Sequence, residues 1–429
     1  MANICSTSLA TPADRVAGLS VPDSVAASPA LARVARGKLC SGCGLCAAIA
    51  PGVEMALAAP GYLRPRQVGP VTEAQDRAIA ATCPGLVIDE TGAAPAPVDD
   101  VLWGRSHFTG TGHASNTALR HQASSGGMIS ALLVHALATG LVDFVIQTGA
   151  DPARPTGNVA VVSTDADDVF AAAGSRYAAS APLAALEDWL TRPGRFAFVG
   201  KPCDVTALRA RARHDPRIDA KVPIMLAFFC AGVPSADGAG RILAALGVKA
   251  DAVASFRYRG DGWPGYATAT LHDGTSRRMS YAASWGDILS KEVQFRCKIC
   301  PDAVGNSADV ACADAWDSDD RGYPSFDEQD GRSLVIARTP AGLALIDAAR
   351  AAESVVTTPL AMTAIAAMQP SQARRKKEIL SRLAALRVTG RPVPHYAGMQ
   401  LGAAARLGSA KQHARSFAGL VRRIVQGRV

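Results

Sequence analysis

The sequence lacks a secretory signal and a membrane-spanning run. Its start, MANICSTSLATPADRVAGLS, has no basic region followed by an apolar core, so no signal peptide is expected. The longest apolar stretch, MISALLVHALATGLVDFVIQ, is interrupted by His135, Gly140 and Asp143 and therefore indicates a helix, a turn and a strand. These two absences predict a cytoplasmic protein.

Cysteine is too scarce for a disulfide scaffold. Ten cysteines in 429 residues, several of them spaced by two intervening residues, are typical of metal ligands in a reducing compartment. The apolar content of 48%, with 39 Gly and 26 Pro, is that of a globular chain, and the length favours two or three domains.

Acidic residues are almost missing from the C-terminal end. Residues 371–429 hold 13 Lys or Arg and one acid, Glu378, which gives this segment a charge of +12. The net charge of the whole chain is +8, so the rest of the chain carries −4. The stretch SFAGLVRRIVQGRV is amphipathic and predicts contact with a membrane surface or an acidic partner. A solvated, charged helical face is the alternative. Binding to nucleic acid is not expected, and a homo-oligomer is left open.

Changes in composition predict four segments. Residues 1–36 resemble a flexible leader, 37–90 a ferredoxin-like module, 101–345 an α/β domain in two parts (101–182 and 183–345), and 346–429 a helical, basic extension. Four short apolar runs alternate with helical patterns, which favours an α/β class with a mostly parallel sheet. These runs are VDFVIQTGA, NVAVVST, RFAFVG and VPIMLAFFC. Residues 253–285 predict a β-hairpin insertion.

The cysteines of the first module predict a 4Fe-4S cluster. Cys40, Cys43 and Cys46 follow C-x2-C-x2-C spacing, which wraps three thiolates around one cube. The bacterial ferredoxin run has a fourth cysteine where this sequence has Ala50, but that cysteine serves a neighbouring cluster. Cys83, in TCPG, is the expected fourth ligand. A structural zinc site on the same four cysteines is the alternative.

Four later cysteines predict a second cluster. Cys297 and Cys300 form another C-x2-C pair, and Cys203 and Cys230 end two strand-like runs. If those strands are parallel neighbours, both thiols lie at the same edge of the sheet. The alternative is that Cys203 and Cys230 are ordinary buried thiols. No cluster role is expected for the two other cysteines, Cys5 in the leader and Cys312 in a core-like strand.

A Ser-Ser-Gly-Gly turn precedes one predicted helix and suits an anion. Ser124 and Ser125 offer hydroxyls, and Gly126 and Gly127 allow a phosphate to approach the backbone at a helix N-terminus. An ordinary helix cap is the alternative. GSRY (174–177) and GKPCD (200–204) are further polar loops, neither specific by itself.

The order of these motifs resembles the coenzyme F420 hydrogenase/dehydrogenase beta-subunit family. It runs C-x2-C-x2-C, CPG, SSGG, GSRY, GKPCD, FFCAG, FRYRGDGWPG, RCKICPD and ADVACADAW, over about residues 38–345. The family includes 7-hydroxymethyl chlorophyll a reductase and a ferredoxin-dependent divinyl chlorophyllide 8-vinyl reductase. The motifs FRYRGDGWPG and SWGDIL are most similar to those of bacterial members of unassigned substrate. The resemblance implies a flavoprotein that binds FAD and one or two 4Fe-4S clusters.

The resemblance also implies particular flavin contacts. The Ser124–Gly127 turn matches the family's flavin-phosphate turn, and Lys201 falls in its Gly-x-Pro-Cys loop. The second loop beside the flavin is matched by Ser175, Arg176 and Tyr177. Ala313 stands where the family commonly has glycine.

The expected function is that of an iron–sulfur flavoenzyme. Electrons from reduced ferredoxin would pass through the clusters to FAD and on to an organic acceptor. Candidate proton donors are Asp204, His121 and Tyr177, each of which also suits a structural role. The alternative is an electron-transfer subunit of a larger complex that reduces a soluble carrier such as a deazaflavin.

Overall fold

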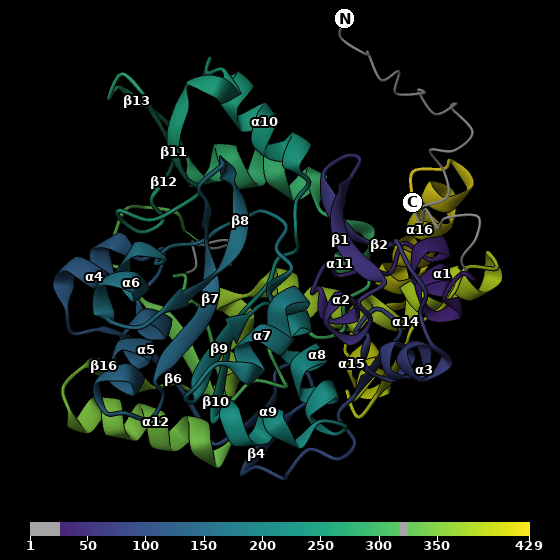
Figure 1. Cartoon of the computed structure of the whole chain (residues 1–429), viewed down its shortest axis with the longest axis horizontal. Helices are drawn as coiled ribbons and strands as arrows, with labels where there is room; N and C mark the ends of the chain where they lie inside the picture. Colours follow the sequence, from purple (N-terminus) through teal and green to yellow (C-terminus); the bar gives the residue numbers. More distant parts are fainter. Residues whose placement is uncertain (1–25, 318–324) are drawn as a thin grey trace, which may run out of the picture.

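A large mixed sheet forms the centre of the computed structural model, which describes residues 26–317 and 325–429 (Figure 1). Its strand order is β16-β6-β15-β14-β10-β9-β7-β8. Strands β7, β9, β10 and β14 run parallel, whereas the other four pair antiparallel with their neighbours. The strands are β6 (Phe108–Ala114), β7 (Phe144–Asp151), β8 (Arg154–Ser163), β9 (Phe196–Gly200), β10 (Ile224–Phe228), β14 (Val310–Asp314), β15 (Ser333–Ala337) and β16 (Val355–Pro359).

The four apolar runs predicted as strands are confirmed as β7, β8, β9 and β10. The α/β class is also confirmed, but the expectation of a mostly parallel sheet is wrong, because four of the seven pairings are antiparallel. Strands β6 (FTGTGHA) and β16 (VVTTP) are rich in Gly and Thr and lack the apolar run that marks a buried strand. Their pairing with β15 and with each other converts a parallel centre into a mixed sheet.

Helices cover both faces of this sheet. One face carries α4 (Thr117–Gln122), α5 (Met128–Ala138), α6 (Ala166–Ala171) and α12 (Pro340–Ala351), and the other carries α7 (Leu186–Thr191), α8 (Pro202–Ala212) and α9 (Pro216–Lys221). Successive strand residues alternate between the two layers, as Val145 and Ile146 of β7 do. The sheet is therefore buried on both sides, and its polar residues gather beyond the strand ends.

The predicted β-hairpin insertion is instead a three-stranded antiparallel sheet. Its strands are β11 (Val253–Arg257), β12 (Tyr266–Leu271) and β13 (Ser276–Ser280), in that order. The third strand, SRRMS, is largely exposed and has no apolar alternation to mark it. Helix α10 (Ala236–Ala245) packs on this sheet through Ile242 and Leu243.

The first module and the C-terminal helices share one hydrophobic core. The module contains α1 (Pro29–Arg36), α2 (Leu45–Ile49), α3 (Glu73–Thr82), the hairpin β1 (Val53–Ala58) and β2 (Tyr62–Gln67), and β3 (Val87–Asp89). Strand β17 (His395–Ala397) pairs with β3, and α14 (Pro370–Val388), α15 (Leu401–Arg406) and α16 (Ala410–Val425) lie beside the module (Figure 1). Leu31, Ile79, Ile379 and Leu420 meet in that core.

This shared core changes the predicted segments. Helix α1 belongs to the folded body through Leu31 and Val34, so the leader does not extend to residue 36. The earlier part of that leader, with Cys5, lies outside the described residues. The remaining short elements are β4 (Val98–Asp100) and β5 (Gly104–Ser106), which pair with each other, and the helices α11 (Phe295–Lys298) and α13 (Ile365–Met368). Among the described helices, none has the length and apolar content to cross a membrane.

Candidate functional site: two cysteine sets and a large cavity

The four cysteines of the first set meet at the junction of α2 and α3. Cys40 and Cys43 lie on the loop that leads into α2, Cys46 lies in its first turn, and Cys83 caps the end of α3. Burial raises the pKa of Cys83 to about 11, with a further contribution from the charge of Cys40. Burial likewise raises the pKa of Cys43, and the charges of Cys83 and Cys40 raise it further. The four cysteines, of which Cys40 and Cys43 are buried and Cys46 and Cys83 partly buried, thus lie within electrostatic reach of one another.

Backbone amides point at these sulfurs. The amide of Gly42 donates to Cys40 Sγ at 3.3 Å, and the amides of Gly85 and Leu86 donate to the Cys83 thiol. Hydrogen bonds to sulfur stabilise thiolates and tune the potential of a bound cluster. These amides offset part of the cost of burying a thiolate, although burial still holds the pKa of Cys83 above its ordinary value.

The second set lines one small cavity, whose volume is about 340 Å³ when its open mouth is included. Cys203 lies in the first turn of α8, directly after β9, and Cys230 follows β10. Strands β9 and β10 are parallel neighbours, so both thiols reach the same edge of the sheet, as expected. Cys297 in α11 and Cys300 just after it close the cavity. Burial raises the pKa of Cys230 to about 12, and Cys297 adds to this shift.

Gly232 allows the second set to close tightly. Its φ is +130°, and a Cβ there would lie 2.4 Å from Val293 Cγ1 and 3.2 Å from Cys297 Cβ. Only glycine accepts that conformation and that contact. The amides of Gly232 and Val233 donate to Cys230 and Cys297, the latter at 3.4 Å.

Two arginines place positive charge beside the second set. Arg375, from α14, donates to the carbonyls of Cys230 (3.2 Å) and Ala231 (2.9 Å). Arg296 is buried and donates to the carbonyl of Pro84 at 2.6 Å, while its Nε and Nη1 have no hydrogen-bond partner among the described residues. A buried cation with unpaired donors requires a nearby anion. A cluster held by four thiolates is such an anion, so the residues fit the predicted group.

A single zinc ion fits less well. The described part of the chain contains no group of three His, Cys, Asp or Glu side chains close enough to hold one metal ion. Zinc requires four ligands about 2.0–2.3 Å from a common centre, whereas a 4Fe-4S cube spreads its four thiolates over four iron atoms. The choice of a cluster over zinc therefore rests on the cysteine spacing in the sequence and on the unpaired donors of Arg296.

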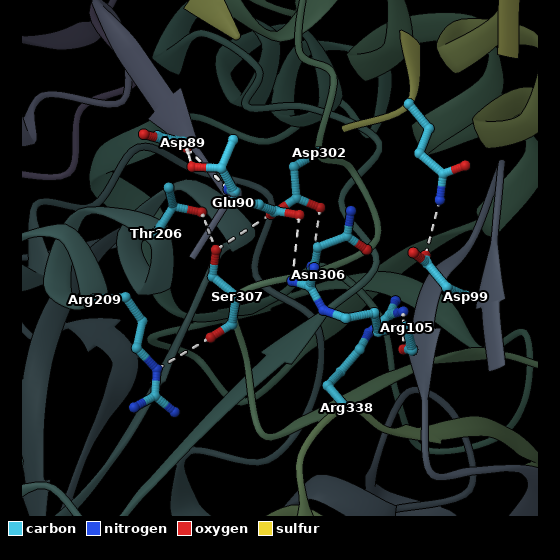
Figure 2. Close-up of polar contacts among 12 residues, drawn as sticks. Asp89, Glu90, Asp99, Arg105, Thr206, Arg209, Asp302, Asn306, Ser307 and Arg338 are labelled. Atoms are coloured by element: carbon cyan, nitrogen blue, oxygen red, sulfur yellow. Dashed lines mark hydrogen bonds and ion pairs between the residues drawn. The ribbon is translucent and has the colours of Figure 1, made fainter. Parts of the chain in front are cut away.

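Buried carboxylates fix the loop that follows Cys300. Asp302 Oδ1 accepts from the amides of Val304 (3.2 Å) and Asn306 (3.1 Å), and the Cys300 thiol donates to the Asp302 carbonyl at 3.0 Å. Figure 2 shows Glu90 beside Asp302, with Ser307 donating to Glu90 at 3.4 Å. Burial, followed by the charge of Asp302, raises the pKa of Glu90 to about 7. This network joins the first module to the α/β domain.

A much larger cavity, of about 1550 Å³ including its open mouth, lies next to the second set. The Ser-Ser-Gly-Gly turn and the GSRY loop meet there, since Ser124 Oγ and Ser175 Oγ are 2.5 Å apart. Gly127 has a φ of +74° and begins α5, whose N-terminus faces the cavity. Lys201 also lines it, with Nζ 2.7 Å from Asp204 and 2.9 Å from Ser180 Oγ.

The electrostatics of Lys201 come from that ion pair. Burial opposes its charge, but Asp204 and Cys203 more than compensate and raise the pKa of Lys201. The side chain therefore carries a positive charge into the cavity wall. Since Asp204 is committed to Lys201, it is a structural partner and not a free proton donor.

Three predicted residues have other roles than expected. Gly126 does not line the cavity; a Cβ there would lie 2.5 Å from the carbonyl of Gly112 and 2.7 Å from the amide of Ser333. Arg176 lines it, but its guanidinium is bound to Asn158 and to the carbonyls of Pro155 and Gly157. His121 is exposed at the end of α4 and lies away from the cavity lining.

Sequence reasoning missed the far wall of the cavity. Arg259 is buried and forms a two-pronged ion pair with Asp314 (2.7 and 2.8 Å). Its guanidinium lies over the rings of Tyr281 and Trp316, which line the cavity with Trp285. These residues fall in FRYRGDGWPG, SYAASW and DAW, where no ligand-like spacing marks them. Cys312, predicted as a core residue, is buried in the sheet as expected.

The two cavities are contiguous. Cys230, Gly232 and Val233 line both of them. One predicted cluster ligand is therefore also part of the wall of the large cavity.

Comparison with known proteins identifies the family. Two segments of the chain match the coenzyme F420 hydrogenase/dehydrogenase beta subunit: residues 109–187 match its N-terminal part, and residues 194–363 match its C terminus. Together the two segments cover more than half of the chain.

Similar proteins come from archaea. The chain is 24% identical over 294 residues to the coenzyme F420 hydrogenase beta subunit of Methanothermobacter thermautotrophicus, covering 66% of this chain and 95% of that protein. It is 25% identical over 248 residues to the coenzyme F420-dependent sulfite reductase of Methanocaldococcus jannaschii, covering 54% of this chain but only 36% of the reductase. A chain in the F420-reducing NiFe hydrogenase complex from Methanosarcina barkeri has a similar fold, with a TM-score of 0.53 and 21% identity over 67% of this chain and 96% of that chain.

The fold and these relatives define an oxidoreductase of the electron-transfer class. The chain belongs to the coenzyme F420 hydrogenase/dehydrogenase beta-subunit family, which confirms the resemblance carried by its motifs. Helices α14, α15 and α16 lie beyond residue 363 and so outside the matched segments.

Proposed function

We propose that the protein is an iron–sulfur flavoenzyme that passes electrons through two 4Fe-4S clusters to FAD and on to an organic acceptor. The observation that carries this proposal is the position of Cys230, which lines both the cysteine cavity and the large cavity. An electron carrier held by the second set would touch the same wall as a flavin. The first set lies on the other side of Arg296, which reaches Pro84 beside Cys83.

The proposed cluster ligands are two sets of four. The first set is Cys40, Cys43, Cys46 and Cys83, and the second is Cys203, Cys230, Cys297 and Cys300. A bound cluster supplies one-electron redox chemistry, and the buried arginines and backbone amides around the thiols offset its negative charge. Because Arg296 stands between the sets, it stabilises charge on either side.

The large cavity suits FAD through its charge and its walls. The N-terminus of α5, the Ser124 hydroxyl and the Lys201 ammonium form a positive end that suits a phosphate. Tyr281, Trp285 and Trp316 form an aromatic wall that suits a planar ring system. A bound flavin supplies the step from one-electron carriers to a two-electron acceptor. Of the predicted proton donors, Tyr177 alone both lines the cavity and has a side chain free of an ion pair.

A second candidate is a subunit that relays electrons and has no acceptor of its own. It is favoured by the fold shared with a chain of the F420-reducing hydrogenase complex. In that case a partner protein would supply the electrons and a soluble carrier such as a deazaflavin would receive them.

Anaerobic reduction of the purified chain tests the proposal. Reduced ferredoxin added to FAD-loaded protein should bleach the flavin absorbance, and the Cys230→Ser variant should lose most of that rate while keeping the flavin. Equal rates in the two proteins would exclude the route through the second set. Turnover of a small organic acceptor by the isolated chain would exclude the second candidate.

A further inference from the structure

A cavity beside α11, of about 600 Å³ including its open mouth, is lined by three cations and no carboxylate. Phe295, Ile299 and Leu420 form its apolar floor. Lys298, Arg382 and Arg423 supply its charged rim, one each from α11, α14 and α16.

The three cations line the same cavity, where Glu378 pairs with Arg382 and the charge of Glu292 reaches Lys298. Arg382 is paired with Glu378 at 2.6 Å and also donates to the Lys298 carbonyl. Neither the Lys298 ammonium nor the Arg423 guanidinium has a hydrogen-bond partner elsewhere in the described ranges, 26–317 and 325–429. Like charges brought together in this way are unfavourable until an anion joins them.

Residues that line this cavity are neighbours of both cysteine sets. Lys298 stands between Cys297 and Cys300, and the charge of Cys297 acts on it directly. Phe295 and Ile299 pack in the same core as Cys40. A negatively charged redox protein bound here would therefore lie near both sets and would leave the flavin cavity, which has a different lining, free.

The apolar face of α16 is not available to a bilayer. Phe417, Leu420, Val421 and Ile424 pack into the core shared with the first module. The expectation of a membrane-binding face rested on those residues. What α16 leaves exposed is its basic side, including Arg422 and Arg423.

We propose that this cavity is the docking site of an acidic electron-carrier protein of the ferredoxin type, whose surface carboxylates pair with Lys298, Arg382 and Arg423. The inference rests on the function proposed above and deepens it by naming where the electrons are delivered. Two of the three cations come from helices outside the segments matched to the family, so the site is a property of this chain's own C-terminal extension. Rim charges of this kind act mainly on the association rate and its dependence on salt.

The test compares two adjacent arginines in the FAD- and cluster-loaded protein. With a reduced, acidic 2Fe-2S ferredoxin of the plant type as the probe, Arg423→Glu should raise the KM for ferredoxin at least tenfold at low salt. Arg422→Glu carries the same charge change on the same helix but lies outside the cavity, and should change the KM less than threefold. Reduction by dithionite, which needs no docking, should be the same in all three proteins.

The outcomes separate the two proposals. If dithionite fails to reduce a flavin or a cluster in the native chain, the proposed function is wrong. If dithionite reduces them but Arg423→Glu and Arg422→Glu affect ferredoxin equally, the docking site is wrong while the function stands. Binding of anionic vesicles or duplex DNA that Arg423→Glu abolishes, with unchanged ferredoxin kinetics, would likewise overturn the docking proposal.

Discussion

Cys230 is the residue at which the two cavities meet. Its thiol faces Cys203, Cys297 and Cys300, while its surroundings also line the large cavity. We predict that Cys230→Ser halves the iron content, removes the signal of one cluster and keeps the FAD. Iron analysis and electron paramagnetic resonance of the reduced protein measure this. A variant that keeps full iron content would show that Cys230 is not a ligand. Cys312→Ser, which lies outside both sets but lines the large cavity, is the control for iron content.

Arg296 is a buried cation whose natural partner is a cluster. We predict that Arg296→Gln lowers the reduction potential of a cluster by about 60 mV, which for one electron corresponds to about 1.4 kcal/mol. Arg296→Lys, which keeps the charge, should move the potential much less. A spectroscopic redox titration measures both. Unchanged potentials in the Gln variant would mean that the guanidinium does not act on either set.

Glu90 makes stability depend on pH. Burial and Asp302 raise its pKa to about 7 in the folded chain, against 4.5 for an ordinary glutamate. The folded state thus keeps an extra proton between those values, and its stabilising contribution is full below pH 4.5 and lost as the pH rises through 7.

We predict that raising the pH from 5 to 8 lowers the thermal midpoint of the native protein more than that of Glu90→Gln. Between pH 5 and pH 8 the free energy of unfolding of the native protein should fall by roughly 2–3 kcal/mol more than that of Glu90→Gln. Differential scanning calorimetry at several pH values measures it, and Glu73→Gln, on an exposed carboxylate, is the control. Parallel pH profiles in native protein and Glu90→Gln would contradict the assignment.

At the scale of elements, α16 holds the first module in place. Leu420 is buried in the core that it shares with Leu31, Ile79 and Cys40, whereas Val425 on the same helix is 78% exposed. We predict that Leu420→Ala destabilises the protein by about 2–4 kcal/mol. Val425→Ala should change stability by less than about 0.5 kcal/mol. Chemical denaturation measures both, and equal effects would mean that α16 is only loosely attached.

The elements also show what a sequence can predict. Strands β7, β9 and β10 and both C-x2-C patterns were predictable because buried parallel strands and cluster loops have strong local signatures. Strands β6 and β16 were not, since their Gly and Thr residues become strands only through pairing with β15. The aromatic wall with Arg259 was missed for the same reason, because its members are assembled from distant segments.

At the scale of the whole molecule, three parts adjoin one another. The first module and the C-terminal helices form one body, the second cysteine set lies at the edge of the central sheet, and the large cavity lies beyond it. The order of the cysteine sets was predictable from the motifs alone. The attachment of the basic extension to the first module was not, because that contact joins residues more than 300 positions apart.

The central claim is that this fold holds two clusters and one flavin. Iron, acid-labile sulfide, zinc and flavin should be measured per chain in protein purified without oxygen. The account predicts about eight iron atoms, about eight sulfides and one FAD. About four iron atoms would remove the second cluster, and zinc in place of iron, or a chain without flavin, would contradict the account.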